Sequence, residues 1–403
     1  MITPPRIGRN NRTKCAQTCM DEGERGLVSQ RENLKDVRRV VLKIGSAVLT
    51  QPSDKSLDRG VFCRLIEMVS TLRTMGKEVI LVSSGAVALG RSRMHLGRPD
   101  HGKRLPTLQA LAAIGQSLLM EYYEKELRYY DLQCAQILLT RADLEDRTRF
   151  NNAQRSMRAL LDMGVIPIIN ENDAVTCDQL RFGDNDTLSA RTAILSRADL
   201  LVIMSDIDAV FTSNPKIDPT VRRIASMEAF SPQLDVYACD SVGDVGTGGM
   251  ITKISAARMA ARMGIATLIL SGKRPKLVLQ ALSGADVGTL LYPTEQPQTL
   301  HKVWLESLST RGKIYCDAGA RDAIVAEGRS LLPKGIRAVE GHFSEGDAVE
   351  LVSPDGLVFA KGLAVYDSTD IQRIAGHHSR EIESILGFHV EDVIVHRDDM
   401  VLR

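Results

Sequence analysis

Residues 40–46 read VVLKIGS, and this stretch shows the pattern that decides the fold. Its first five residues are apolar except for Lys43, without polar alternation, which indicates a strand covered on both faces. A helical pattern over 57–75 follows and ends at Gly76, and a second apolar run covers 79–82. Apolar strands that alternate with helices predict a mostly parallel sheet with helices on both of its faces.

The same alternation continues as far as residue 270. The pattern predicts helices over 106–128, 149–163, 187–197 and 251–263, and strands over 133–139, 165–169, 200–204 and 265–270. In open sheets of this kind, ligands bind at the carboxyl ends of the strands. The polar residues that directly follow each strand are therefore the candidates for a functional site.

The chain is too long for one ordinary domain, with 403 residues. Residues 1–36 show neither period, and we predict a flexible N-terminal extension there. The α/β domain is predicted over 37–296 and a linker over 297–310, because residues 292–297 read YPTEQP. Short apolar runs at 312–317 and 347–352, separated by glycine turns, predict a small β-rich domain over 311–403.

Composition excludes several classes of protein. Hydrophobic residues are 44% and charged residues 25% of the chain, which excludes collagen-like, disordered and disulfide-scaffold proteins. No apolar run approaches the roughly 20 residues that cross a bilayer, so no membrane partner is expected. The seven cysteines are scattered without a CxxC pair, which is typical of reduced thiols and predicts a cytoplasmic protein.

Two of the strand ends suggest phosphate binding. Lys43 lies near the end of the first strand and the turn Gly45-Ser46 follows it, while Ser84-Gly85-Ala86 follows the second strand. Glycine turns let backbone N–H groups approach an anion. A lysine at a sheet edge and a plain strand-to-helix turn are the structural alternatives. The stretch GTGGM at 246–250 precedes a helix with Lys253, and it predicts a phosphate-binding loop. Its glycines, threonine and lysine follow one another in a different order from the GxxxxGK[ST] motif, which the sequence does not contain.

Carboxylates and amides gather after other strands. NEND at 170–173 follows a buried strand directly, and GDND at 183–186 comes a few residues later. Ser205-Asp206 follows the strand 200–204, a suitable place for the base or ribose of a nucleotide. No plausible Ser-His-Asp arrangement is present. Chemistry without histidine favours phosphoryl transfer, and a carboxylate acceptor with a pKa of about 4.3 is already ionised at pH 7 and needs no general base.

These motifs, in this order, resemble the amino acid kinase family, and within it the enzymes that phosphorylate the side-chain carboxylate of glutamate. The matching stretches are VLKIGS at 41–46, VSSGA at 82–86, LLTRAD at 138–143, INENDAV at 169–175, GDND at 183–186 and GTGGMITK at 246–253. The last domain resembles a PUA domain on GHFSEGD at 341–347 and IAGHHS at 374–379. The resemblance implies the amino acid kinase fold over 37–296 and a PUA domain over 311–403.

The resemblance also implies roles for individual residues. Lys43 and Lys253 would hold the transferring phosphoryl group, and Asp184 would orient these two lysines. The residues implied to bind glutamate are Ser84, Asp173 and Asn185. The residues implied to bind ATP are Lys43, Ser205, Asp206, Thr247, Gly248, Gly249, Met250, Ile251, Thr252 and Lys253. No protein ligand of a metal is implied.

What the family does extends these expectations to the reaction and its partners. The resemblance implies that the enzyme uses ATP with Mg²⁺ and forms L-glutamyl 5-phosphate, in the first step of proline biosynthesis. It also implies inhibition by proline and a homo-oligomer of two or four subunits. One departure is Asp208-Ala209, where the family often has Lys-Gly, and the nucleotide contacts of that loop stay open.

Two alternatives stay open at this level. One is a kinase for another carboxylate, such as acetylglutamate or aspartate, and the NEND stretch argues against it. The other is an RNA-binding regulator, because PUA domains elsewhere bind RNA. Residues 311–403 contain 11 Lys and Arg and 16 Asp and Glu, a net charge of −5. An acidic module binds a phosphate backbone poorly, so a nucleic-acid partner is not expected.

Overall fold

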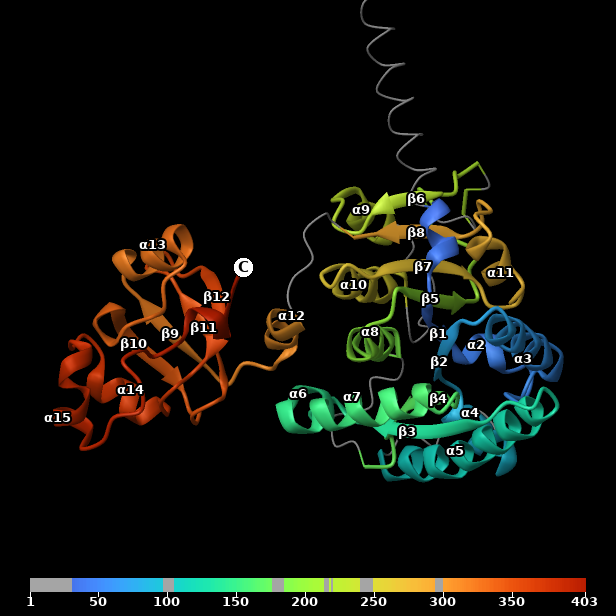
Figure 1. Ribbon diagram of the computed structural model, residues 1–403, viewed down its shortest axis with the longest axis horizontal. Coiled ribbons are helices and arrows are strands. Elements are labelled where there is room, and N and C mark those ends of the chain that lie inside the picture. Colours follow the sequence, from blue (N-terminus) through green and yellow to red (C-terminus); the bar gives the residue numbers. More distant parts are fainter. Residues whose placement is uncertain are drawn as a thin grey trace, which may run out of the picture. The chain divides into compact units, whose positions relative to one another are not determined.

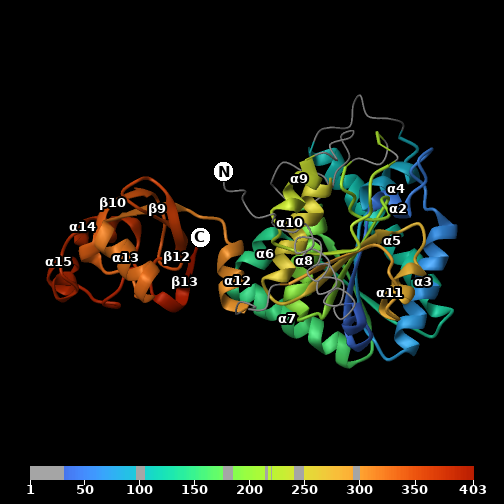
Figure 2. The same ribbon diagram turned by 90° about the horizontal axis from the view of Figure 1, so that it is seen from above.

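A computed structural model describes residues 31–96, 105–175, 185–213, 217–218, 220–239, 249–293 and 300–403. The chain divides into two compact units, the first ending at Pro297 and the second beginning at Gln298. Figure 1 and Figure 2 show an open sheet with helices on both faces in the first unit and a smaller sheet in the second. Each unit is described by itself.

The first unit is built on one twisted sheet of eight strands, in the order β3-β4-β2-β1-β5-β7-β8-β6. All neighbours are parallel except the antiparallel pair β7 and β8. The strands are β1 (Arg39–Ile44), β2 (Glu78–Ser83), β3 (Cys134–Leu139), β4 (Ile166–Glu171), β5 (Leu200–Ser205), β6 (Ser226–Glu228), β7 (Ala266–Ser271) and β8 (Thr289–Tyr292). The mostly parallel α/β sheet predicted from the sequence is confirmed.

Two layers of helices cover this sheet. One face carries α2 (Ser46–Leu49), α3 (Arg59–Thr74), α4 (Ala86–Arg93), α5 (Leu105–Arg128) and α11 (Leu277–Leu282) (Figure 2). The other carries α6 (Arg141–Glu145), α7 (Arg147–Asp162), α8 (Asn185–Ser196), α9 (Gln233–Cys239) and α10 (Met250–Ala261). Along β1, Val40, Leu42 and Ile44 join the core on the α3 face. Because side chains alternate along a strand, Lys43 points to the opposite face, toward α8.

Helices α4 and α5 approach each other more closely than side chains would allow. A Cβ atom added to Gly115 would lie 1.7 Å from the carbonyl oxygen of Ala86, and one added to Gly90 would lie 2.0 Å from that of Leu111. Only glycine fits at either position, because both contacts are with rigid backbone. This contact fixes the middle of α5 against α4, which begins directly after β2.

The last part of the predicted N-terminal extension is held on the first unit. Residues 1–30 lie outside the described residues, but 33–36 form the 3-10 helix η1 (Asn33–Asp36), and Leu34 is 3% exposed. The buried guanidinium of Arg31 donates to the carbonyl oxygens of Ala285 and Val287, each at 3.1 Å, and pairs with Asp286 at 3.0 Å. A buried guanidinium needs such partners, so the first unit begins by residue 31.

The second unit contains a five-stranded sheet in the order β10-β9-β11-β12-β13. Its strands are β9 (Gly312–Cys316), β10 (Ile336–Gly341), β11 (Ala348–Val352), β12 (Val358–Leu363) and β13 (Met400–Leu402). Its helices are α12 (Leu300–Ser307), α13 (Ala318–Glu327), α14 (Ser368–Ile374) and α15 (Ile382–Leu386), with the 3-10 turns η2 (Pro333–Gly335), η3 (Ser379–Glu381) and η4 (Arg397–Asp399).

Helix α12 falls in the stretch that we predict to be a linker. It packs against β12 and β13. The ammonium group of Lys361, a residue that is only 2% exposed, donates to the carbonyl oxygens of Glu306 (3.0 Å) and Leu308 at the end of this helix. These bonds offset the cost of burying the charge, and they attach α12 to the second unit.

The cysteines and the length of the helices can be compared with the sequence analysis. Cys63, Cys134 and Cys316 are free cysteines. Among the residues that the structure describes, none of the helices combines the length and the apolar character that a bilayer crossing requires.

Candidate active site

A buried carboxylate between two lysines is the centre of the first unit. Asp186 Oδ1 lies 2.6 Å from Lys43 Nζ, and Asp186 Oδ2 lies 3.3 Å from Lys253 Nζ. The Thr252 hydroxyl donates to Asp186 Oδ2 at 2.7 Å. Asp186 is fully buried, and the two lysines are 6% and 3% exposed. Three elements that are distant in sequence, β1, α8 and α10, meet at this point.

The electrostatics of this cluster favour a bound anion. Burial opposes ionisation of Asp186, but Lys43 and Lys253 hold the pKa of this carboxyl below its usual range. Burial lowers the pKa of Lys253 from its ordinary value, and Asp186 partly offsets that effect. With the carboxylate ionised and both lysines charged, the cluster carries one net positive charge in a place that excludes water. A phosphoryl group would restore neutrality there.

The acid that contacts both lysines is Asp186, whereas the resemblance gave this role to Asp184. Asp184 lies outside the described residues. Asp186 is in the first turn of α8, on the same helix face as the buried Ala190 and Ala193, and α8 packs against β1. A small-residue face that follows an acid at helical spacing is the sequence signal that singles out Asp186 within GDND.

A second cluster, made of hydroxyl and amide groups, lies at the ends of β2 and β4. Asn185 Nδ2 donates to Ser84 Oγ at 2.6 Å and contacts the carbonyl oxygen of Ser83 at 3.2 Å. Asn185 also contacts Asn170 Oδ1 at 3.2 Å. Gly85 adopts φ of +102°, a conformation that favours glycine, and turns the chain from β2 into α4. The structure therefore brings together two predicted glutamate-binding residues, Ser84 and Asn185, and adds Asn170.

Asp173, the third predicted glutamate-binding residue, lies just beyond β4. It makes no hydrogen bond to Ser84 or Asn185 within the described part of the chain. It is partly buried, and burial raises the pKa of its carboxyl to about 6. A carboxylate with this pKa is destabilised in its charged form by desolvation, and a cationic partner would relieve that cost.

The predicted nucleotide side lies at β5 and α10. Ser205, at the end of β5, donates from Oγ to Asp206 Oδ1 at 2.9 Å. Gly249 is the N-cap of α10. Within the described part of the chain, no side chain caps this helix and no atom lies within 4 Å of a Cβ added to Gly249. The N–H groups of Met250, Ile251 and Thr252 start the helix and have no intrahelical partner, so they suit a phosphate. Thr247 and Gly248 lie outside the described residues.

The loop after β5 departs from the expected Lys-Gly in a way that the structure explains in part. Asp208 pairs with Arg274 at 2.9 Å, and both side chains are more than half exposed. Ala209 is fully buried. The acidic residue that stands where the family often has lysine is therefore paired with Arg274.

The two clusters lie where the direction of strand succession reverses. β1 is parallel to β2 on one side and to β5 on the other. Residues directly after these three strands are Gly45, Ser84 and Asp206. In open parallel sheets this reversal point is where ligands bind, so the topology and the side chains indicate the same site.

Comparison with known proteins matches residues 38–271 to the amino acid kinase family. The chain belongs to that family. A protein of Geobacter sp. (strain M21) named glutamate 5-kinase is 46% identical over 374 residues, which are 93% of this chain and 100% of that protein. A glutamate 5-kinase of Trichlorobacter lovleyi is 46% identical over 370 residues, covering 92% and 98%. One of Nitrosococcus oceani is 45% identical over 375 residues, covering 93% and 99%.

Residues 312–386 of this amino acid kinase match the PUA domain. Both resemblances drawn from the sequence motifs, to an amino acid kinase and to a PUA domain, are therefore confirmed. The amino acid kinase fold is the eight-stranded sheet with its two helix layers, and the PUA domain is the five-stranded sheet of the second unit.

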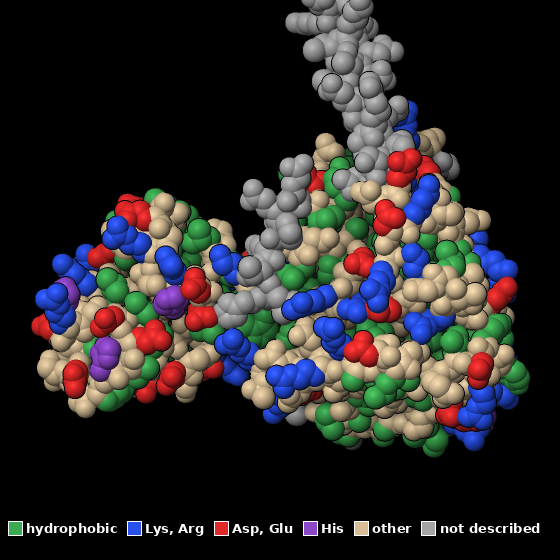
Figure 3. Space-filling model, in the orientation of Figure 1, with side chains coloured by type: hydrophobic (Ala, Val, Ile, Leu, Met, Phe, Trp, Pro, Cys, Tyr) green, Lys and Arg blue, Asp and Glu red, His purple; other side chains and the backbone are tan. Residues whose placement is uncertain are grey.

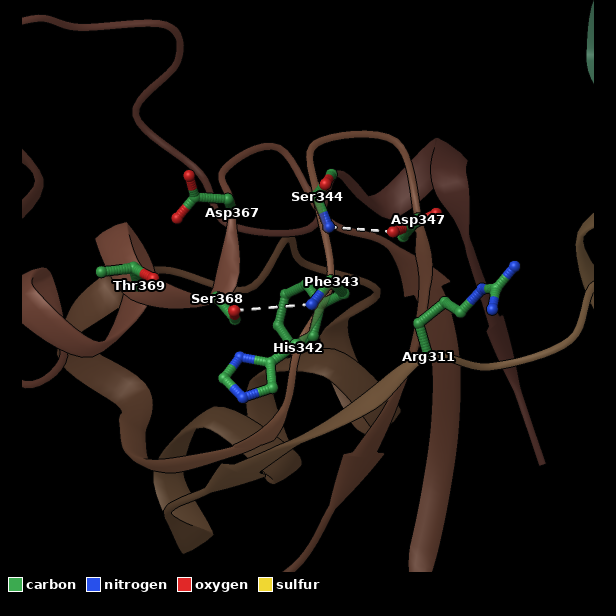
Figure 4. A pocket seen from close by; sticks show the side chains of 8 residues that line it. All are labelled: Arg311, His342, Phe343, Ser344, Asp347, Asp367, Ser368 and Thr369. Atoms are coloured by element: carbon green, nitrogen blue, oxygen red, sulfur yellow. Dashed lines mark hydrogen bonds between the residues drawn. The ribbon is translucent and has the colours of Figure 1, made fainter.

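The PUA domain of this kinase contains an open polar pocket of about 390 Å³ (Figure 4). Three of its polar side chains bond to the loops that form it. Asp347 accepts from the backbone N–H of Ser344 at 2.8 Å, Ser368 Oγ accepts from that of Phe343 at 3.4 Å, and Asp367 caps α14. On the face in Figure 3, acidic side chains lie among the basic ones of this domain, with no continuous basic patch. These three side chains therefore stabilise the loops around the pocket.

Proposed function

We propose that this amino acid kinase transfers the γ-phosphoryl group of ATP to the side-chain carboxylate of L-glutamate. The products are L-glutamyl 5-phosphate and ADP, and the reaction is the first step of proline biosynthesis. The observation that carries the proposal is the buried Lys43–Asp186–Lys253 cluster, which lies at the same sheet edge as the Ser84–Asn185 pair. The relatives named glutamate 5-kinase, which match over nearly the whole chain, support it.

The chemistry requires positioning and positive charge. The acceptor carboxylate is an anion at neutral pH and reacts without a general base. Its approach to the γ-phosphate brings two negative charges together, and Lys43 and Lys253 offset this repulsion. In comparable sites, one donor aimed at the developing charge contributes about 3–4 kcal/mol to the lowering of the barrier. Asp186 touches both lysines and keeps them apart at fixed positions, so it is a positioning residue.

The nucleotide site is assigned to the start of α10. The N–H groups at the start of this helix, the Thr252 hydroxyl and Lys253 form a donor set that fits the β- and γ-phosphates. Mg²⁺ takes most of its ligands in such sites from phosphates and water, and it neutralises phosphate charge. Ser205 and Asp206 are assigned to the base or ribose.

The glutamate site is assigned to Ser84, Asn185 and Asp173. Asp173 supplies a carboxylate that favours a cation, which suits the α-ammonium group of an amino acid. Asn185 and Ser84 supply further amide and hydroxyl groups around the same substrate. The free cysteines suit a reducing cytoplasm. Inhibition by proline and assembly into dimers or tetramers belong to the same proposal, and are tested by adding proline to the assay and by measuring the mass in solution.

A substrate panel tests the proposal. ADP release is followed with L-glutamate, L-aspartate and N-acetyl-L-glutamate, each with ATP and Mg²⁺. We expect turnover with L-glutamate and at least 100-fold lower kcat/KM with the other two, because the site must match both the free ammonium and the chain length (roughly the discrimination that unpaired buried groups give). Preference for another carboxylate contradicts the proposal. A salt-sensitive complex with structured RNA at physiological ionic strength would favour the RNA-binding alternative.

A further inference from the structure

A chain of side-chain amides leads from α5 to the substrate-binding Asn185. Gln116 Nε2 donates to Gln136 Oε1 at 3.2 Å, and Asn170 Nδ2 donates to Gln116 Oε1 at 2.9 Å. Asn185 Nδ2 then contacts Asn170 Oδ1 at 3.2 Å. Gln116 and Asn170 are 9% and 3% exposed, so these bonds are made away from water. Gln116 is 69 residues from Asn185 in sequence and is joined to it through Asn170 alone.

Backbone groups determine which way each hydrogen bond runs in this row of side-chain amides. The backbone N–H of Glu171 donates to Asn170 Oδ1 at 2.9 Å, and a backbone N–H group can only donate a hydrogen bond, never accept one. The oxygen of Asn170 must therefore face that N–H, and its nitrogen must face Gln116. Gln116 in turn presents its oxygen to Asn170 and its nitrogen to Gln136. Neither amide is free to flip without loss of a buried hydrogen bond.

Neighbouring acceptors fix the orientation of Asn185 as well. Its amide contacts the carbonyl oxygen of Ser83 at 3.2 Å and Asn170 Oδ1 at 3.2 Å, and both of these atoms are acceptors. Its nitrogen must therefore face them. The Asn185 Oδ1 atom accepts no hydrogen bond from the residues that the structure describes, and it stays available as an acceptor. An acceptor at this place pairs with an ammonium group and disfavours an N-acylated nitrogen, which carries less charge and more bulk.

We propose that Gln116 is a positioning residue for the amino group of the substrate. It holds Asn170, Asn170 holds Asn185, and Asn185 thereby offers an oxygen to the α-ammonium group. Gly115, one residue earlier, anchors α5 against the backbone of Ala86, so Gln116 is presented from a rigid element. The inference rests on the proposed function, because it assigns Asn185 to the amino acid substrate.

The test compares Gln116→Met, Gln116→Glu and a control, Gln280→Met. Methionine keeps the length of the side chain and removes both hydrogen bonds. A glutamate side chain at position 116 keeps an acceptor for Asn170, and the exposed Gln136 is able to rotate and donate to that side chain. Gln280 lies on the exposed side of α11, away from this chain of amides. Steady-state KM for L-glutamate and for ATP is measured for each variant, with thermal unfolding as a check on folding.

We expect Gln116→Met to raise KM for L-glutamate about ten-fold, the effect of one lost buried hydrogen bond, with KM for ATP and kcat within two-fold. Gln116→Glu restores most of the loss, and Gln280→Met changes nothing. Glutarate has both carboxylates and no ammonium group, and its inhibition constant should change less than two-fold in Gln116→Met. An unchanged KM for L-glutamate, or KM values for both substrates that rise together, overturns the inference.

Failure of the proposed function gives a different result. In that case the wild-type protein itself does not turn over L-glutamate, whatever residue stands at 116. The same variants are then compared on the amino acid that the wild type does use. A selective rise of its KM in Gln116→Met supports the positioning role, and no rise overturns it.

Discussion

Asp186 Oδ1 and Lys43 Nζ lie 2.6 Å apart at a point where neither residue is more than 6% exposed. The acid comes from the first turn of α8 and the lysine from the middle strand β1. A buried pair of this kind stabilises little by itself, because desolvation cancels much of the attraction. Because a second lysine, Lys253, also contacts Asp186, the cluster has an excess of positive charge that can bind an anionic substrate. This excess indicates a functional role.

Replacement of Asp186 tests which acid holds the lysines. Asp186→Asn leaves two buried lysines without a counter-charge, so we expect kcat to fall by roughly 10²–10³-fold. The free energy of unfolding should fall by about 3–5 kcal/mol, the usual effect of breaking a buried ion pair. Asp184→Asn, made in parallel, should lower kcat less. The measurements are steady-state rates well below the unfolding temperature, and chemical denaturation.

The lysines are expected to act on the rate. Lys43→Met and Lys253→Met keep most of the side-chain volume and remove the charge, so each should lower kcat by about 10²-fold or more. Lys276→Met is the matched control, because that lysine forms an exposed pair with Glu67. A variant of Lys43 or Lys253 with kcat near that of the wild type contradicts the mechanism.

The pH dependence of glutamate binding should report Asp173. Burial raises the pKa of this carboxyl to about 6, so the charged form that attracts an ammonium group is lost as the pH falls through that value. We expect kcat/KM for L-glutamate to fall about ten-fold per pH unit below pH 6. Asp173→Asn should flatten this slope and lower kcat/KM at pH 8. A slope that persists in Asp173→Asn assigns the titration to another group.

The contact between α4 and α5 should tolerate no side chain. In Gly115→Ala the new Cβ would lie 1.7 Å from the carbonyl oxygen of Ala86, so the helices must separate. Overpacking of this kind costs about 1–3 kcal/mol of unfolding free energy. Gly319→Ala in α13 is the control, since its Cβ would meet only the Asp317 carboxylate at 3.6 Å. Chemical denaturation measures both, and equal stability of the two variants contradicts the packing argument.

The sequence pattern predicts the first unit well, because buried parallel strands leave a local signal. The run 40–44 corresponds to β1, and the helical pattern over 251–263 corresponds to α10 (Met250–Ala261). Lys43 and Lys253 are recognisable since a buried strand and a glycine loop place them in unusual contexts. These features depend on neighbours within a few residues.

Other features depend on contacts that no local pattern records. The choice of Asp186 within GDND follows from which face of α8 meets β1. The role of Gln116 follows from Asn170, 54 residues later. The helix in the predicted linker is held by Lys361, which lies more than 50 residues away. For Gln116 and for the helix in the predicted linker the decisive partner is distant in sequence, so periodicity and motif spacing contain no trace of it, whereas for Asp186 the small-residue face of α8 is a local signal.

The most direct test of the central claim is detection of the acyl phosphate itself. The wild-type protein and Asp186→Asn are incubated with ATP, Mg²⁺ and hydroxylamine, which converts an acyl phosphate to a hydroxamate. With L-glutamate present, we expect γ-glutamyl hydroxamate from the wild type and at least 100-fold less from Asp186→Asn (roughly the loss of one aligned charge contact). Without L-glutamate we expect none. Hydroxamate formed equally by both proteins, or none from the wild type, would contradict it.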